Sequence, residues 1–380
     1  MTDTACGPHA EEATRVLGFD CADVSSVVSL RWPWELTNWT MPLLELLVIG
    51  GVVFALVHAV RRYRNGDPVN LALWCASLVY LFVIEPPLYF PEWFGLDELY
   101  GFIFAHNRFT AGFMADRLPL YIVAFYPMIS QLAYELVRSL GIFRWRGALA
   151  GSVAVALACQ VFYEIFDHVG PQLKWWTWND DNHIVNHPAM ASVPLTSMLL
   201  FASVSMGAMT YLVVRLTATP AADGRPRRGW DLGLRVLLAG VLTPVAMVIA
   251  NVPSSLFGGA TPDGTARAWI LGIELALIWL AGGWIIVSHL RDPGRGPGEP
   301  PSAFARYYPV IYLGAMAVFW AAALPQYLAA QYLGAQDGIT RDGTPTGSGP
   351  YVVACFLGAG LLVALLHRRA RTHRTDPAGV

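Results

Sequence analysis

The sequence predicts an all-α, polytopic integral membrane protein with about nine transmembrane helices. The first observation is composition, because 55% of the 380 residues are apolar and only 14% are charged, whereas a soluble domain carries about 25% charged residues. The second is segmentation, because the mean hydropathy is +0.45 and the apolar residues gather in runs of the roughly 20 residues that span a bilayer. The third is the alternation of arginine-rich and arginine-poor connecting loops.

Nine apolar runs satisfy the length requirement of a membrane-spanning helix. They are separated by connectors such as "RDPGRGPGEPPSAFAR", whose Pro, Gly and Arg content is typical of solvated loops. The last run is the shortest. The predicted spans are 41–60, 68–87, 118–140, 147–168, 193–215, 231–252, 267–289, 307–331 and 350–367.

Basic residues orient these spans, because cytoplasmic loops of membrane proteins are enriched in Lys and Arg. Most of the 25 basic residues follow the first, third, fifth, seventh and ninth spans. We therefore expect a multi-pass protein of the plasma membrane with its N-terminus outside and its C-terminus in the cytoplasm. The arginines on the predicted cytoplasmic side are Arg61, Arg62, Arg64, Arg138, Arg144, Arg146, Arg215, Arg225, Arg227, Arg228, Arg291, Arg295, Arg306, Arg368, Arg369, Arg371 and Arg374.

The same topology divides the chain into one transmembrane domain and two tails. The domain covers 41–367, between an extracytoplasmic tail at 1–40 and a cytoplasmic tail at 368–380. The outer loop 86–117 is rich in aromatic residues, so it holds either a helix lying at the interface or an ordinary aromatic belt. The outer loop 169–192 is expected to lie over the functional site.

Charge and cysteine content limit the partners. A net charge of −2 gives no indication of a nucleic-acid partner, so the expected partners are the lipid bilayer and an apolar small molecule. Cys6 and Cys21 both lie in the N-terminal tail, where they either form a disulfide or remain thiols. The sequence does not predict the oligomeric state.

Polar side chains from several spans fall at one predicted depth near the outer surface. Glu164 and His168 are four residues apart in the fourth span, and Asp167 lies between them, so these side chains share one stripe of the helix. A charge in hydrocarbon costs a few kcal/mol, so such residues usually face a cavity or one another. We therefore expect a polar pocket that also includes residues placed by depth alone, which are Glu85, Asn251, Glu274 and Gln326.

Glu135 lies at the other end of the third span, three residues before Arg138. Charged residues three or four positions apart in a helix form local ion pairs. We therefore predict a surface ion pair there and not a functional group.

The stretch "LKWWTWNDDNHIVNHP" suggests two chemistries for the pocket. A carboxylic acid in apolar surroundings stays protonated near neutral pH and can protonate a double bond. Trp175, Trp176 and Trp178 lie nearby in sequence, and aromatic faces stabilise a carbocation. Interfacial anchoring is the alternative role of these tryptophans.

The second chemistry is metal binding. "HIVNH" places His183 and His187 four residues apart, so both rings reach one zinc ion if the segment is helical, with Asp181 as a further ligand. The motif lacks the glutamate of a zinc-protease HExxH sequence. Zinc is therefore the alternative to a reaction that uses no cofactor.

The region around the end of the fourth span resembles membrane proteins of carotenoid biosynthesis related to bisanhydrobacterioruberin hydratase. The shared features are Glu164 near a helix end, Gly170 in a turn, two aromatic residues at Trp176 and Trp178, Pro188, and a "VPL" segment at 193–195. This chain departs from the family in "FDHVGPQLK" and in "NHP". The resemblance covers a small part of the chain, and it implies a polytopic enzyme that adds water across a terminal isoprenoid double bond without a redox cofactor.

These observations predict a membrane enzyme that acts on an isoprenoid, carotenoid or other lipid-like substrate by hydratase- or cyclase-like acid–base chemistry. The expected catalytic residues are Glu164 as the acid, with Asp167, His168 and Glu274. The alternatives are a secondary transporter or channel-like protein, a zinc-dependent membrane hydrolase, and a non-catalytic membrane subunit. The transporter alternative lacks the inverted repeat that many transporters contain.

Overall fold

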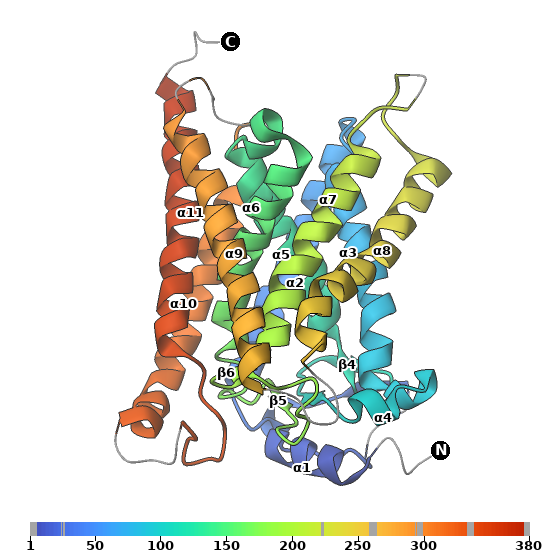
Figure 1. Ribbon diagram of the computed structural model, residues 1–380, viewed down its shortest axis with the longest axis vertical. Helices are drawn as coiled ribbons and strands as arrows, with labels where there is room; N and C mark the ends of the chain where they lie inside the picture. Colours follow the sequence, from blue (N-terminus) through green and yellow to red (C-terminus); the bar gives the residue numbers. More distant parts are fainter. Residues whose placement is uncertain are drawn as a thin grey trace.

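A computed structural model describes residues 6–23, 25, 27–221, 224–257, 264–292, 294, 299–332 and 338–375, and its long helices stand side by side as one bundle (Figure 1). Within these residues, nine helices are long and apolar enough to cross a membrane, which confirms the predicted all-α membrane class. The helices are α2 (Thr40–Arg64), α3 (Val69–Tyr89), α5 (Leu120–Ser139), α6 (Ile142–Asp167), the π-helix η3 (Ser197–Ser205) continued by α7 (Met206–Thr217), α8 (Gly229–Ser255), α9 (Gly264–Arg291), α10 (Ala303–Tyr332) and α11 (Gly349–Thr375).

Two of the observed helix starts differ from the predicted ones for local reasons. The fourth helix begins at Ile142, but Gly147 (φ 79°) interrupts it with a non-helical conformation, so the long apolar part begins close to the predicted boundary. The fifth was predicted to begin at residue 193. Val193 and Pro194 instead form a strand, and the helix begins at Ser197 as a π-helix.

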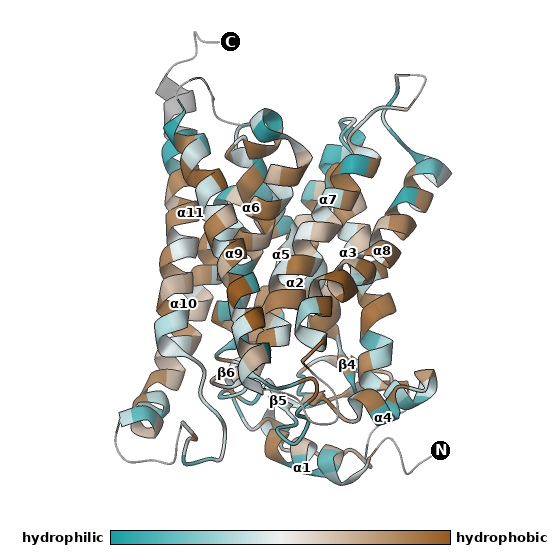
Figure 2. Cartoon of the chain, in the orientation of Figure 1, coloured by the Kyte–Doolittle hydropathy of each residue, from teal (hydrophilic) through white to brown (hydrophobic). Residues whose placement is uncertain are grey.

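Helices α5 and α6 form the centre of the bundle. Buried residues make up 89% of the α5 span and 78% of the α6 span, but only 22% of the α9 span. Apolar side chains such as Leu280 and Trp284 on α9 are exposed, and apolar residues dominate the middle of the bundle in Figure 2. Helices surrounded by protein can carry groups that would be unfavourable in lipid, and α5 and α6 carry Glu135, Glu164 and Asp167.

One end of the bundle, the lower end in Figure 1, is covered by a folded layer that we call the cap. It consists of residues 7–39, 90–119, 168–196 and 338–348, apart from residues 24 and 26. Three small antiparallel sheets order it, with strand orders β1-β3-β4, β2-β5 and β6-β7. Its elements are α1 (Pro8–Leu17), β1 (Val28–Leu30), η1 (Pro33–Glu35), η2 (Pro91–Phe94), α4 (Asp97–Tyr100), β2 (Phe104–His106), β3 (Ala111–Phe113), β4 (Leu118–Pro119), β5 (Trp176–Trp178), β6 (Ala189–Met190) and β7 (Val193–Pro194).

The N-terminal segment is part of this cap. A disulfide joins Cys6 to Cys21, which decides between the two states considered for these cysteines. The Thr37 hydroxyl donates a hydrogen bond to the carbonyl of Leu17 (3.1 Å), so the segment after the disulfide packs back on α1.

Strands β2 and β5 join the two outer loops. Phe104 pairs with Trp178, and His106 pairs with Trp176. The segment 86–117 contains only the short helical segments η2 and α4 before these strands, in place of a longer interfacial helix. Gly95 (φ 66°) and Gly101 (φ 55°) follow the two segments with positive φ angles, a conformation that ends helices and that glycine adopts most readily.

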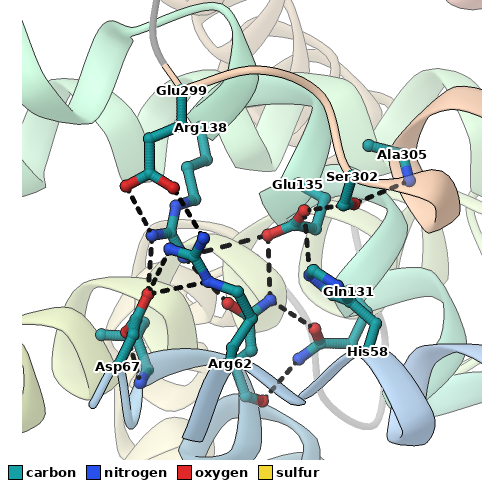
Figure 3. A network of polar contacts seen from close by, with 11 residues as sticks. His58, Arg62, Asp67, Gln131, Glu135, Arg138, Glu299, Ser302 and Ala305 are labelled. Atoms are coloured by element: carbon teal, nitrogen blue, oxygen red, sulfur yellow. Dashed lines mark hydrogen bonds and ion pairs between the residues drawn. The ribbon is translucent and has the colours of Figure 1, made fainter. Parts of the chain in front are cut away.

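The opposite, arginine-rich end of the bundle, which carries Arg62 and Arg138, is held by a buried polar network (Figure 3). Glu135 is 3% exposed, and its carboxyl group lies 3.0 Å from His58 Nε2. It also accepts hydrogen bonds from Asn70 Nδ2 (3.0 Å) and Ser302 Oγ (2.8 Å). The predicted ion pair with Arg138 is present at 3.9 Å, but Glu135 is buried and its other partners lie closer.

The remaining part of this network consists of arginine–carboxylate pairs. Arg138 lies 2.6 Å from Asp67 and 3.0 Å from Glu299, and Arg62 contacts the same two carboxylates at 2.6 and 2.7 Å. Glu299 precedes α10, whereas Arg62 ends α2 and Arg138 ends α5. The network therefore fixes several helices to one another where the bundle meets water.

Candidate functional site

A cavity of about 80 Å³ lies where the cap meets the bundle, between α3, α5, α6 and η3. Its wall combines aromatic rings with two carboxyl groups, Glu85 and Asp167. Segments distant in sequence therefore form one largely apolar chamber that contains two acids. The residues of the wall with aromatic rings are Phe104, His106, Phe125, Tyr126, Tyr163, Phe166, Trp176, Trp178 and Phe201.

Both carboxyl groups are brought to this level by helix ends. Asp167 is the last residue of α6, is 3% exposed and accepts a hydrogen bond from Ser197 Oγ (3.3 Å). Glu85 lies near the end of α3, is 5% exposed and accepts a hydrogen bond from the Tyr126 hydroxyl. Among the described residues, neither carboxyl forms an ion pair with Arg or Lys. Each faces the cavity with hydroxyl partners only, Glu85 with a second one from Tyr89.

Close ring packing sets the shape of the chamber. Trp176 packs on Phe166 with ring centroids 4.7 Å apart, and Trp178 meets Phe104 edge to face at 5.4 Å. The Trp176 ring also lies against Gly170, where an added Cβ atom would come within 2.0 Å of it. The close approach of this ring therefore requires glycine at position 170. The packed rings leave little room for side chains of the wall to move.

Trp175 does not line this cavity, although the sequence analysis grouped it with Trp176 and Trp178. Its side chain is fully buried, and Nε1 donates a hydrogen bond to Thr40 Oγ1 (2.9 Å). The ring packs edge to face on Phe319 at 5.1 Å. Because successive residues of a strand point to opposite sides, Trp175 points away from the chamber and fastens the cap to α2 and α10.

Glu164 and His168 lie on another face of α6 and are not among the cavity-lining residues. Both are fully buried, and Glu164 Oε2 lies 3.4 Å from His168 Nε2. Burial lowers the pKa of His168 to about 4, because loss of hydration disfavours the imidazolium. The structure thus separates the predicted catalytic trio, with Asp167 in the chamber and the other two behind it.

The π-helix η3 contacts both polar faces of α6. Ser197 donates a hydrogen bond to Asp167, and Ser203 donates one to Gln160, whose amide in turn donates to the Tyr351 hydroxyl (3.0 Å). Such π-helical turns are rare and occur frequently at functional sites. This geometry therefore also points to the end of α6 next to the cap as the functional region.

His106 is a wall residue that sequence reasoning did not select. Its Nδ1 lies 3.0 Å from the Tyr121 hydroxyl, and burial lowers the pKa of this histidine to about 3. Tyr126 and Ser197, which donate to the two carboxyl groups, were also missed. No local motif marks these residues, because each reaches the site only through the β2–β5 pairing or the packing of the helices.

Three residues chosen by depth alone are not brought to the chamber. Gln326 is exposed and donates a hydrogen bond to Asp342 (3.1 Å). Asn251 accepts one from Ser254 (2.8 Å), and Glu274 is partly exposed on α9. None of the three lines the cavity, because residues at one depth on a helix can face any direction around it.

The predicted zinc ligands do not form a group of three among the described residues, although the rings of His183 and His187 lie with their centroids 4.8 Å apart. Residues 183–187 form turns and not a helix, and His187 Nε2 lies 3.2 Å from Asp180 Oδ1. The described residues contain one group of three potential ligand atoms close enough to share a metal ion, which is Cys6, Asp20 and Cys21. Because those cysteines form a disulfide, the geometry gives no support to zinc chemistry at His183, His187 and Asp181.

Comparisons with protein-family models, with curated proteins and with solved structures give no match to this chain. The functional argument therefore depends on the chamber itself.

Proposed function

We propose that this protein is a membrane enzyme that protonates a carbon–carbon double bond of an isoprenoid or other lipid-like substrate. The observation that carries the proposal is the pair of carboxyl groups, Glu85 and Asp167, in one chamber otherwise walled by aromatic rings. A carboxylic acid without a basic partner is a suitable proton donor. Aromatic faces attract a cation in a desolvated site, so the same wall would stabilise the carbocation formed by protonation.

The two carboxyl groups can serve as the general acid and the general base of this reaction. We assign the acid to Asp167 and the base to Glu85, in place of Glu164. Protonation of the double bond moves the Asp167 proton to carbon. The cation then either takes up water, whose proton passes to Glu85, or loses a proton to Glu85 after cyclisation or double-bond migration. These outcomes are those of a hydratase, a cyclase and an isomerase, and none requires a redox cofactor.

The size of the chamber limits what enters it. A water molecule takes about 30 Å³ of the liquid, so a cavity of about 80 Å³ admits the end of a branched hydrocarbon and not a whole lipid. The remaining part of the substrate would extend among the helices into the bilayer. This fit favours reaction at a terminal double bond.

We propose that the cap lies outside the cytoplasm and that the arginine-rich end lies within it. The Pro- and Gly-rich arginine loops support this orientation, because arginine is enriched in cytoplasmic loops. The protein would then be a multi-pass protein of the plasma membrane, with its chamber in the outer half of the bilayer.

One alternative function has a specific observation in its favour. Aromatic cages also bind stable organic cations such as quaternary ammonium groups, so the chamber would suit a transporter of such a cation with Glu85 and Asp167 as counter-charges. Uptake of a labelled quaternary amine into proteoliposomes, abolished by Asp167→Asn, would support the transporter and would contradict the enzyme if lipid composition stays unchanged.

Profiling of lipids and pigments in the host tests the enzyme. Deletion of the gene is expected to accumulate a precursor that differs from the product by one water, or that has equal mass and altered retention. Asp167→Asn and Glu85→Gln should reproduce the deletion, whereas the exposed Gln326→Ala should not. Normal profiles from both carboxyl variants at normal expression would end the proposal.

A further inference from the structure

Glu164 and His168 form a buried pair that the proposed reaction does not use. His168 Nε2 has no hydrogen-bond partner among the described residues. The Glu164 carboxyl group interacts with the side-chain amide of Gln160, which also donates to the Tyr351 hydroxyl (3.0 Å). Buried polar atoms without partners are uncommon in native proteins and require an explanation.

The hydrogen bond on the other side of the ring fixes the tautomer. The backbone N–H of Ser348 donates to His168 Nδ1 (3.2 Å), and a nitrogen that accepts a hydrogen bond carries no proton. The proton of the neutral ring is therefore on Nε2, which faces Glu164 at 3.4 Å. His168 thus presents a transferable proton to the carboxyl group.

Asp167 is the one charged group among the described residues for which an interaction with this pair is found. Glu164 and Asp167 are three residues apart on α6, and side chains at this spacing are neighbours on a helix. The electrostatic fields of Glu164 and His168 both act on Asp167. The other described groups that interact with Glu164 are uncharged, namely the Gln160 amide and the hydroxyls and thiols of Cys159, Tyr163, Tyr351 and Cys355.

A thin layer of chain separates His168 from water. Gly347 lies so close to it that an added Cβ atom would come within 2.1 Å of the His168 carbonyl oxygen. The neighbouring residues Gly343, Pro345 and Thr346 line an open depression of about 840 Å³ on the cap. The segment 338–348 therefore has His168 on one side and a water-accessible surface on the other.

We infer that His168 and Glu164 form a proton relay between water at the cap and Asp167. This inference rests on the proposed function, since it supplies the acid of that reaction with a new proton. His168 and Glu164 are positioned to transfer the proton and do not touch the substrate.

The transfers balance as follows. Glu164 gives its carboxyl proton to the Asp167 carboxylate that remains after protonation of the substrate. When the Ser348 amide moves away, Nδ1 of His168 takes a proton from water, and the imidazolium gives its Nε2 proton to Glu164. The neutral ring, now protonated at Nδ1, then turns toward the cap, gives its Nδ1 proton to water, takes a proton from water at Nε2 and turns back. One net proton has then moved from water to Asp167.

Hydrogen–deuterium exchange of carboxyl groups, followed by infrared spectroscopy on the full chain in lipid, tests the relay without substrate. The C=O bands of protonated Asp167 and Glu85 are assigned from Asp167→Asn and Glu85→Gln. In His168→Gln, whose side-chain oxygen still accepts from Ser348, exchange of Asp167 should slow by roughly 10²-fold, the order of one general acid–base step. Glu164→Gln should have the same effect, and Glu85 should exchange as before.

The matched control is Ser205→Ala, which removes a buried hydroxyl that donates to the Phe201 carbonyl (2.7 Å) on the same helical segment. Unchanged exchange of Asp167 in His168→Gln, or equal slowing in Ser205→Ala, would overturn the relay. Host lipid profiles decide the proposed function separately. If the exchange measurements support the relay but Asp167→Asn leaves the host lipids unchanged, the proposed reaction is refuted and the relay is not.

Discussion

Replacement of Glu135 by leucine gives the sharpest test of how the arginine-rich end is built. A local pair with Arg138 at the helix surface would contribute only about 0.2–0.5 kcal/mol. In the structure Glu135 is 3% exposed and contacts His58, Asn70 and Ser302 at 2.8–3.0 Å. The two interpretations therefore predict losses that differ by about tenfold.

The expected magnitude follows from these contacts. Loss of a neutral hydrogen bond costs about 1 kcal/mol, which applies to Asn70 and to Ser302. Removal of the carboxylate also leaves His58 Nε2 buried without a partner, which costs about 1–3 kcal/mol. Together we expect Glu135→Leu to lower the free energy of unfolding by about 4 kcal/mol.

Unfolding in mixed detergent micelles, followed by tryptophan fluorescence, measures this loss. The control is Asp231→Asn, because Asp231 pairs with Arg227 and Arg235 (2.8 and 2.9 Å) at the exposed start of α8. That control should change stability little, since exposed pairs contribute weakly. If Glu135→Leu lost no more stability than the control, the buried network could not be what fixes these helices.

Two further predictions concern the chamber. His106 should make the protein less stable in acid. Its pKa is about 3 in the folded protein and about 6.5 in the unfolded chain, so below pH 6.5 the unfolded chain takes up a proton that the folded protein does not. The free energy of unfolding should therefore fall by up to about 1.4 kcal/mol per pH unit. His106→Gln should flatten this dependence between pH 6.5 and 4.5, and an unchanged slope would rule out His106 as its source. Gly170→Ala should lose about 1–3 kcal/mol by overpacking and alter the fluorescence of Trp176, because its Cβ atom would come within 2.0 Å of that ring; Gly50→Ala, with no atom within 4 Å, should be neutral or stabilising.

The positions of the helices could be predicted from the sequence, but the direction in which each side chain points around its helix could not. Apolar runs of spanning length correspond to all nine long helices, because hydropathy is a local property. The cluster around Asp167 was also predictable, because acids near the end of a helix are conspicuous in an apolar chain. Depth along the helices led to Glu274, Asn251 and Gln326, none of which reaches the chamber, because rotation about a helix axis is fixed by packing.

The cap was the least predictable part. Three-residue strands such as β2 and β5 are too short to show the alternation of apolar and polar residues by which a strand is predicted. Their pairing also joins residues about 70 positions apart. His106 enters the chamber only through this pairing. The zinc hypothesis stays a prediction. The segment folds as turns and not as a helix, yet it still brings the rings of His183 and His187 together, with centroids 4.8 Å apart. Among the described residues Asp181 does not complete a group of three ligand atoms with them.

The central position of α5 and α6 has an evolutionary consequence. Because 89% and 78% of the residues in their apolar windows are buried, these two helices tolerate few substitutions. Most positions of α9 need only an apolar side chain. A saturation library scored for growth should therefore show strict preferences along the inner pair and near-interchangeable Leu, Ile, Val and Phe on the perimeter. Selection would then conserve the sequences of α5 and α6 while the sequences of the surrounding helices diverge. Distant relatives would be recognisable mainly by these two helices.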